Sequence, residues 1–328
     1  MQEINDANEF KGLFLVKTAA RWIEQAKTQP IPKMLFGEFW FEGEICILFA
    51  DTNLGKSILS VQIGNSISEG KQIVGFVLES GKQIILYFDF ELSYKQFENR
   101  YSKKFSDHYS FDENFIRVEI NPDADVPDGS SFEDYLNSSL ERSIRETGAK
   151  ILIIDNLTYL KNETEKAKDA LPLMKHLKAL KNKYGLSILA LAHTPKRDLT
   201  KPITRNDLQG SKMLINFCDS SFSIGESHTD KNIRYLKQIK ARNTEIIYDA
   251  ENVCVCQISK PDNFLKFEFI NYGSEREHLK QPTEHDKVNQ NAKVNELHQQ
   301  GRSLREIGTE LGISHMKVSR ILKECNTL

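Results

Sequence analysis

The sequence predicts an α/β domain built around a mostly parallel sheet, followed by a small all-α domain. Three observations support this prediction. From about Glu44 to Ile270, short apolar runs alternate with longer amphipathic stretches. The last apolar runs of that region follow one another without long helices, which predicts an antiparallel extension of the sheet. After Tyr272 the composition becomes polar, and a compact apolar pattern resumes only at Val294.

These changes in composition divide the chain into four expected parts. Residues 1–36 are a helical lead-in, because apolar residues recur at helical spacing before the first two prolines. Residues 37–272 are the α/β domain. Residues 273–293 have almost no apolar content and are expected to be a linker. Residues 294–328 are the all-α domain.

Four apolar runs have the composition of strands buried on both faces, because Ile and Leu dominate them with little polar interruption. These runs are ICILF at 45–49, QIILYFDF at 83–90, KILIID at 150–155 and SILALAH at 187–193. The stretches between them predict helices at 56–68, 94–104, 131–147 and 167–184. The strands of the antiparallel extension are expected at 221–224, 233–239, 253–259 and 267–270.

Charge and composition exclude several classes of protein. The 328 residues include 44 Lys and Arg against 46 Asp and Glu, for a formal net charge of −2. This balance excludes a uniformly basic, histone-like protein but allows a locally basic DNA-binding surface. No apolar run approaches the ~20 residues of a membrane helix, and the polar N-terminus does not resemble a signal peptide. We therefore expect a cytoplasmic protein with no membrane partner.

The first apolar run leads into the segment ADTNLGKS at 50–57 and then into a helix. In this strand-to-helix context the segment matches the end of the phosphate-binding pattern G-x-x-x-x-G-K-[ST]. Backbone N–H groups of such a turn point at phosphates. Lys56 would neutralise phosphate oxygens and the Ser57 hydroxyl would bind Mg²⁺, so ATP and Mg²⁺ are the expected cofactors. The expected nucleotide-binding residues are Asp51, Thr52, Asn53, Leu54, Gly55, Lys56, Ser57 and Ile58.

Ala50 stands where this pattern has its first glycine. Alanine tolerates a positive φ poorly, so we expect the opening of the loop to be tighter or differently shaped. The departure motivates the hypothesis of a nucleotide-binding scaffold with poor hydrolysis.

Polar residues lie at the ends of the other three apolar runs. Because the carboxyl ends of parallel strands meet at the ligand edge of a sheet, Asp155 is expected to hold Mg²⁺ directly or through water. Glu91 is favoured as the base that orients and deprotonates an attacking water, with Asp89 as the runner-up. His193 could sense the γ-phosphate through a hydrogen bond. The alternative for each is an ordinary strand-end residue.

The order of these segments resembles that of the RecA-like ATPases, and most closely the plasmid RepA and DnaB type of hexameric replicative helicase. The resemblance covers about residues 35–270 and includes AxxxxGKS, FDFELS, KILIIDN, LALAHTPK, LQGSKML and QIKARN. It implies a homo-oligomeric ring, a hexamer, in which Lys240 and Arg242 reach the neighbouring subunit's nucleotide. Without the resemblance, Lys240 and Arg242 are interpreted as charged residues on a solvent-facing strand edge. The expected catalytic residues are Lys56, Glu91, Asp155, His193, Lys240 and Arg242, and the expected metal ligands are Ser57 and Asp155.

A long, polar and basic loop is expected at 194–212. In RecA-like rings, the loops after the strands that bear Asp155 and His193 line the central channel, and this loop resembles one of them. Its cations would follow the backbone of single-stranded DNA, and the alternative is a mobile surface loop. The cations concerned are Lys196, Arg197, Lys201 and Arg205.

Residues 303–322 resemble a helix-turn-helix of the resolvase-like kind. Gly308 is small where two helices would cross, Gly312 permits a tight turn, and Ser314 would cap the second helix. This module is expected to bind duplex DNA, and the alternative is a helical protein-interaction module. The expected duplex-binding residues are His315, Lys317, Ser319, Arg320 and Lys323.

The leading hypothesis is therefore an ATP-hydrolysing, RecA-like motor of the RepA helicase kind, held on duplex DNA by its C-terminal module and serving replication of a plasmid or mobile element. The unwinding activity rests on the resemblance alone. A second hypothesis, of another class, is a DNA-binding regulator or loader in which ATP switches assembly without strand separation.

Overall fold

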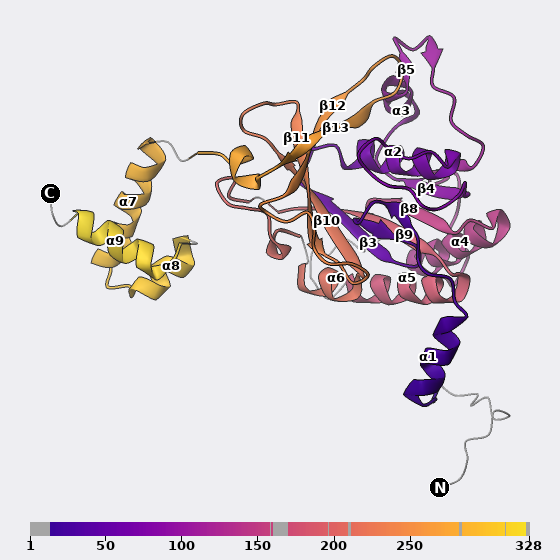
Figure 1. Cartoon of the computed structure of the whole chain (residues 1–328), viewed down its shortest axis with the longest axis horizontal. Coiled ribbons are helices and arrows are strands. Elements are labelled where there is room, and N and C mark those ends of the chain that lie inside the picture. The colour runs from indigo at the N-terminus through magenta and orange to yellow at the C-terminus, as the bar shows by residue number, and fades with distance from the viewer. Residues whose placement is uncertain are drawn as a thin grey trace, which may run out of the picture.

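The computed structural model describes residues 14–157, 159, 170–195, 197–208, 211–281, 284–311 and 313–325. An α/β domain comes first, and three helices follow it as a separate unit (Figure 1). The predicted fold class, a mostly parallel sheet with an antiparallel extension and flanking helices, is confirmed. Within the described residues, no helix combines the length and apolar character that crossing a membrane requires.

The central sheet has nine strands in the order β13-β12-β11-β10-β3-β9-β8-β4-β7. The strands from β10 to β7 are parallel. They are β3 (Ile45–Ala50), β4 (Ile85–Asp89), β7 (Phe115–Val118), β8 (Ile151–Asp155), β9 (Ser187–His193) and β10 (Ser220–Glu226). The antiparallel extension consists of β11 (Ile233–Lys240), β12 (Val253–Ser259) and β13 (Lys266–Gly273). Among the nine strands of this sheet, β7 alone was not predicted, because it is a half-buried edge strand whose short apolar run Arg117 interrupts.

Helices connect the parallel strands and cover both faces of the sheet (Figure 1). They are α2 (Lys56–Glu69), α3 (Tyr94–Arg100), α4 (Phe132–Thr147), α5 (Ala170–Tyr184) and α6 (Ser211–Phe217). The helix predicted at 94–104 ends earlier, because the chain turns into a hairpin of β5 (Ser102–Lys103) and β6 (Asp107–His108). Of the helix predicted at 167–184, the first three residues lie outside the described part of the chain.

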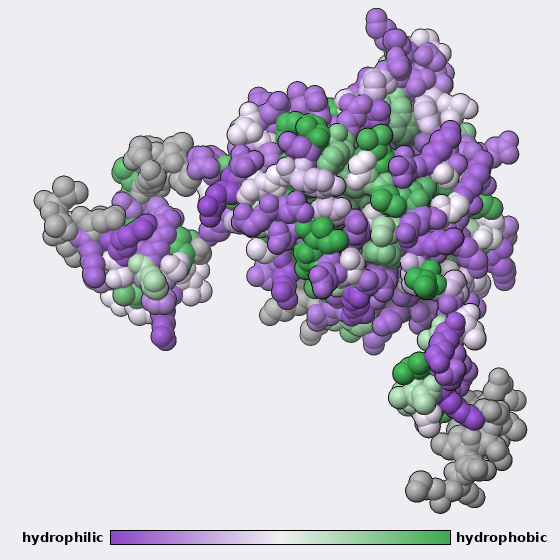
Figure 2. All heavy atoms as spheres, viewed as in Figure 1, coloured by the Kyte–Doolittle hydropathy of each residue, from purple (hydrophilic) through white to green (hydrophobic). Residues whose placement is uncertain are grey.

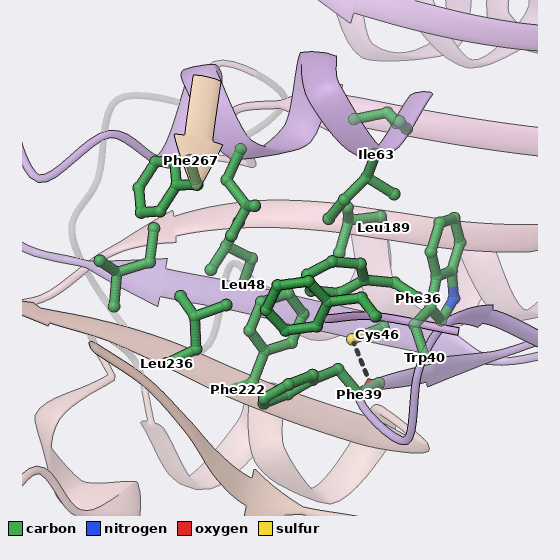
Figure 3. Close-up of a cluster of buried hydrophobic side chains, with 14 of the residues drawn as sticks. Phe36, Phe39, Trp40, Cys46, Leu48, Ile63, Leu189, Phe222, Leu236 and Phe267 are labelled. Atoms are coloured by element: carbon green, nitrogen blue, oxygen red, sulfur yellow. Dashed lines mark hydrogen bonds between the residues drawn. The ribbon is translucent and has the colours of Figure 1, made fainter. Parts of the chain in front are cut away.

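Alternate residues of the apolar strands fill two separate cores. In β3, Ile47 and Phe49 face the α5 side, while Cys46 and Leu48 face the α2 side. The core on the α2 side is rich in aromatic rings, including Phe36, Phe39, Trp40, Phe222 and Phe267 (Figure 3). Burial on both faces explains why these strands appear in the sequence as continuous apolar runs.

The predicted lead-in over residues 1–36 divides into a helix and the start of the core. Helix α1 (Ala19–Lys27) begins at the capping residue Thr18 and has no buried residue. The chain then forms β1 (Met34–Phe36) and β2 (Trp40–Phe41), and Leu35 and Phe36 are fully buried. The α/β domain therefore starts before residue 37. Residues 1–13 lie outside the described part of the chain.

The structure also differs from the linker predicted over residues 273–293. After β13 the chain folds back as the short helix η2 (Glu275–His278), in which Glu275 has an exposed fraction of 0%. Its carboxylate accepts hydrogen bonds from Ile203 N (2.7 Å) and Tyr235 OH (3.2 Å) and pairs with Lys237 Nζ. Composition missed this segment because a buried ion pair and a single apolar side chain, Leu279, attach it to the domain.

The C-terminal unit consists of α7 (Glu284–Gln299), α8 (Leu304–Leu311) and α9 (His315–Cys325) around its own apolar core. A side chain at Gly308 would meet Ile313 O at 2.7 Å, so only glycine fits where α8 meets the start of α9. Ser303 and Ser314 accept hydrogen bonds from backbone N–H groups of the first turns of α8 and α9. Gly312, the predicted turn residue, lies outside the described residues.

We predict that Glu275→Ala lowers the free energy of unfolding by about 3–5 kcal/mol, because it leaves Lys237 buried without its anion. The measurement is urea unfolding followed by circular dichroism. Glu277, two residues away and exposed, is the matched control, and Glu277→Ala should change the free energy by at most about 0.5 kcal/mol. Equal effects of the two substitutions would contradict this account of the segment.

Candidate active site

The ends of four adjacent parallel strands, β3, β9, β8 and β4, meet at one edge of the sheet. Ala50 pairs with His193, and Asp89 pairs with Asp155, so the strands end at matching levels. The loops that leave this edge carry Lys56 and Glu91. The structure thus brings together four of the six predicted catalytic residues: Lys56, Glu91, Asp155 and His193.

Ala50 causes no strain in the phosphate loop. It is the last residue of β3, and positive φ values occur instead at Asn53 (63°) and Gly55 (99°). Asparagine and glycine are the residues that adopt this conformation at least cost. The expectation of a distorted loop opening at Ala50 therefore loses its physical basis, and so does the scaffold hypothesis that depends on it.

Gly55 is also required by a contact with the antiparallel extension. A side chain at this position would meet the ring of Phe267 at 2.9 Å and Ile258 at 3.0 Å. The Gln62 amide holds β13 in place, donating to Phe267 O (2.9 Å) and accepting from Phe267 N (2.8 Å). The extension therefore supports the phosphate loop from behind, a role that sequence patterns did not reveal.

Lys56 is held as a nearly buried cation, with an exposed fraction of 7%. Its Nζ donates to Ala50 O and Asp51 O, both at 3.0 Å, and to His193 Nδ1 at 3.2 Å. Burial lowers the pKa of the ammonium group, and the carboxylates of Asp155, Glu91 and Asp51 oppose this effect. An incoming phosphate would add the anionic partner that such a buried cation lacks.

Asp155 is fully buried beside the phosphate loop. Its Oδ2 accepts a hydrogen bond from Tyr87 OH at 2.7 Å, while Oδ1 is buried without a hydrogen-bond partner. Burial raises the pKa of this carboxyl to about 6, against the opposing effect of the Ser57 and Tyr87 hydroxyls. A carboxylate oxygen and a hydroxyl are the ligands that Mg²⁺ prefers, so Asp155 and Ser57 fit this ion, which would satisfy the orphaned Oδ1.

Glu91, Asn156 and His193 form a polar cluster next to Lys56. The Asn156 amide donates to Glu91 Oε1, and His193 Nε2 lies 3.1 Å from Asn156 Nδ2 and 3.5 Å from Glu91 Oε1. The hydrogen bond from His193 lowers the pKa of Glu91, so this carboxylate is ionised at neutral pH.

The structure distinguishes Glu91 from Asp89, the other candidate base. Asp89 is buried and forms an ion pair with Arg117 at 2.8 Å. It also accepts from the backbone N of Glu91 (3.2 Å) and Leu92 (2.9 Å), so its acceptors are already in use. Asp89 therefore shapes the turn that presents Glu91, whereas the Glu91 side chain is 42% exposed and accessible to water.

Lys240 and Arg242 do not approach the phosphate loop of their own chain. Lys240 pairs with Ser221 near the start of the parallel strands, at the opposite edge of the sheet. Its Nζ donates to Cys218 O at 2.7 Å and to Ile215 O. Arg242 lies beyond the end of β11 and forms an ion pair with Asp219 at 3.0 Å.

The predicted DNA-contacting cations lie on two other parts of the chain. Arg197 donates to Lys201 O, Lys201 lies 3.4 Å from Asp198, and Arg205 is exposed in a short 3₁₀ turn. Lys196 lies outside the described residues. Of the predicted duplex-binding residues on α9, His315, Lys317, Arg320 and Lys323 are exposed and Ser319 is half-buried.

Three residues of the site were not found from the sequence: Tyr87, Asn156 and Gln62. Asn156 directly follows the strand-end residue Asp155, and its position was a usable signal. Tyr87 is polar at its tip and lies within an apolar run, which is typical of a buried tyrosine with a hydrogen-bond partner. Gln62 gave no signal, because its partner is 205 residues away.

Glu91→Gln is expected to lower kcat for ATP by about 10²–10⁴-fold while nucleotide affinity stays within a few-fold, because only the base is lost. Phosphate release and titration with a fluorescent nucleotide measure the two quantities. Asp89→Asn is the comparison, and it should lower the melting temperature because Arg117 loses its buried partner. Normal turnover in Glu91→Gln would exclude Glu91 as the base.

Comparison with known proteins identifies the family of this chain. The family profile described as an AAA domain matches residues 14–198, more than half of the chain. No curated protein matches the sequence. Among solved structures, a KaiC-like protein from the hyperthermophilic archaeon Pyrococcus horikoshii is similar at 14% identity and a TM-score of 0.45, over 70% of this chain and 90% of that chain. The family match, which includes the phosphate loop, Glu91, Asp155 and His193, shows that this chain belongs to the AAA domain family of P-loop ATPases.

Proposed function

We propose that the protein is an ATP-driven DNA motor, similar to the RepA-type replicative helicases, that acts in replication of a plasmid or mobile element. The observation that carries the proposal is the contact of Lys56 and Glu91 with the same histidine, His193, at the edge of the sheet. One side chain thus touches both the expected phosphate ligand and the expected base, and its backbone continues directly into the candidate DNA loop.

The residues of this site suit phosphoryl transfer to water. Lys56 would neutralise the β- and γ-phosphate oxygens, and the loop N–H groups would hold the phosphates. Glu91 would orient the attacking water and accept its proton as the water oxygen bonds to the γ-phosphorus, while the bond from that phosphorus to the β–γ bridging oxygen breaks and ADP leaves. When bound to Ser57 and Asp155, Mg²⁺ would supply positive charge to the β- and γ-phosphates.

Contacts of the loop at 194–208 support a link between the nucleotide and single-stranded DNA. Thr194 N donates to Ala50 O at 3.1 Å, so the loop starts against the phosphate loop. Further along, Ile203 donates to Glu275 and accepts from Lys237 Nζ at 2.8 Å. The loop is held at Thr194 and at Ile203, and we propose that Arg197 and Lys201 between these points, together with Arg205 just beyond them, follow the DNA backbone.

The position of Lys240 and Arg242 favours a homo-oligomeric ring. Both lie at the sheet edge opposite the phosphate loop, so they can serve a nucleotide only on another subunit. A cation supplied in trans stabilises the charge that develops on a transferring phosphoryl group. The Arg242 ion pair with Asp219 would then be exchanged for a phosphate of the neighbour.

We assign duplex DNA binding to the C-terminal unit. Its second and third helices meet closely at Gly308, and α9 exposes His315, Lys317 and Arg320. A short helix with such residues suits the major groove. A lone unit of this size binds weakly, and a ring that presents several would raise the effective concentration.

We predict that single-stranded DNA raises the ATPase rate several-fold if the protein is a motor, because strand movement and hydrolysis are coupled. Phosphate release with and without an unstructured oligonucleotide, on protein sized by chromatography, measures this effect. Lys56→Ala should abolish turnover in both conditions and is the control for contaminating ATPases. A flat response to DNA would favour the alternative, an ATP-switched DNA-binding regulator or loader without strand unwinding.

Deleting residues 282–328 should remove duplex affinity and leave the basal ATPase rate unchanged. The cut must follow residue 281, because Glu275 and His278 are buried against the α/β domain. Anisotropy of a labelled duplex and phosphate release are the two measurements. Duplex binding that survives the deletion would exclude the C-terminal helices as the main duplex contact.

A further inference from the structure

The hairpin β5–β6 forms a fully exposed tip on the α/β domain. Residues 103–108 are all exposed. The tip projects beyond α3 and the β12–β13 hairpin (Figure 1), and the same region is a hydrophilic protrusion in Figure 2. Phe105 stands out within this polar surface, because its side chain is 50% exposed.

The backbone of the tip has an unusual conformation for its sequence. Ser106 N donates to Lys103 O at 3.2 Å, and both residues between them are left-handed, Lys104 at φ 53° and Phe105 at φ 59°. Turns of this type strongly prefer Asn-Gly, because a Cβ opposes positive φ. Lysine and phenylalanine oppose the turn that they occupy, so the fold itself does not explain their presence.

The base of the hairpin is rigid. Tyr101 and Ser102 are buried, and Tyr109 N donates to Tyr101 O at 2.8 Å. The rings of Tyr101 and Tyr109 lie 5.1 Å and 4.4 Å from that of Phe264 in the neighbouring hairpin. Because the base is anchored, the backbone of the tip is already ordered before binding.

Three lysines lie around Phe105, against two acids, Glu98 and Asp107. Lys95 Nζ lies 5.7 Å from the centroid of its ring. Lys103 and Lys104 directly precede it in the chain, and neither forms an ion pair with any described residue, although Asp107 lies opposite Lys103 in the hairpin. The nearest acid on α3, Glu98, is already paired with Lys95 (2.5 Å) and His108 (2.9 Å).

We infer that this tip binds single-stranded nucleic acid, with a base stacked on Phe105 and the adjoining phosphates held by Lys103 and Lys104. An aromatic ring beside cations is the arrangement that binds unpaired bases without sequence preference. A protein contact of similar strength would need apolar surroundings, whereas the neighbours of Phe105 are Lys104, Ser106 and Asp107. The inference is independent of the ATPase site and of the proposed motor function.

The test compares two probes on the full-length chain, a labelled oligothymidylate and an abasic strand of equal length. Phe105→Ala should weaken oligothymidylate binding by at least about fivefold and leave abasic binding unchanged, because only stacking is lost. Phe132 is the matched control, since its side chain is 48% exposed on α4, and Phe132→Ala should change neither affinity.

Two further variants separate binding from structure. The double variant Lys104→Asn, Phe105→Gly fits the turn better, so its melting temperature should equal or exceed that of the native chain while oligothymidylate affinity falls further than in Phe105→Ala, because a phosphate contact is lost as well. Removing both lysines, Lys103→Ala with Lys104→Ala, should weaken both probes and reduce the slope of log affinity against log salt by about 1.4.

Several outcomes would overturn the inference. Unchanged oligothymidylate binding in the better-folded double variant is one. An equal loss for both probes in Phe105→Ala is another, because stacking would not be involved. A change in oligomer size by chromatography would show that the tip contacts another copy of the chain. ATPase rates and duplex affinity, measured on the same samples, report separately on the proposed motor function.

Discussion

The candidate active site depends on one constraint, the matching levels at which neighbouring parallel strands end. Ala50 is in register with His193, and Asp89 with Asp155, so the phosphate loop, the histidine and both carboxylate positions meet at one edge. A shift of a single residue between two strands would turn their side chains to opposite faces. The two apolar cores that enclose the sheet therefore also set the geometry of the site.

Two charged side chains, Lys56 and Asp155, are buried at this edge without a full set of hydrogen-bond and ionic partners. Lys56 has only carbonyl and imidazole acceptors, and Asp155 Oδ1 has no hydrogen-bond partner. Burying such groups costs free energy that a nucleotide phosphate and its metal ion would recover on binding. Tyr87 and Asn156 hold Asp155 and Glu91 in fixed orientations, and this prevents the charged groups of the site from pairing with one another. This arrangement is typical of a preorganised electrostatic site.

A second set of buried charges ties the C-terminal part of the domain to the loop that follows His193. Glu275 accepts a hydrogen bond from Ile203 N, and Lys237 donates one to Ile203 O. In addition, Lys280 N donates to Leu199 O at 3.1 Å. Buried ion pairs add little net stability compared with apolar residues, but they fix one arrangement, because any other leaves a charge unpaired. The chain that leads to the three-helix unit is thus anchored beside the candidate DNA loop.

The sequence by itself determined the strand-turn-helix of the phosphate loop, the apolar parallel strands, the polar residues at their ends and the compact C-terminal pattern, because each is a local periodicity or motif. Only the tertiary structure decided that Asp89 forms an ion pair with Arg117, whereas Glu91 stays accessible to water. It also decided that Asn53 and Gly55, and not Ala50, adopt the left-handed backbone conformation. The same is true of Phe267 behind the phosphate loop and of Glu275 within the expected linker. The contacts among these features join residues far apart in the chain, and such pairs leave no periodic signal in the sequence.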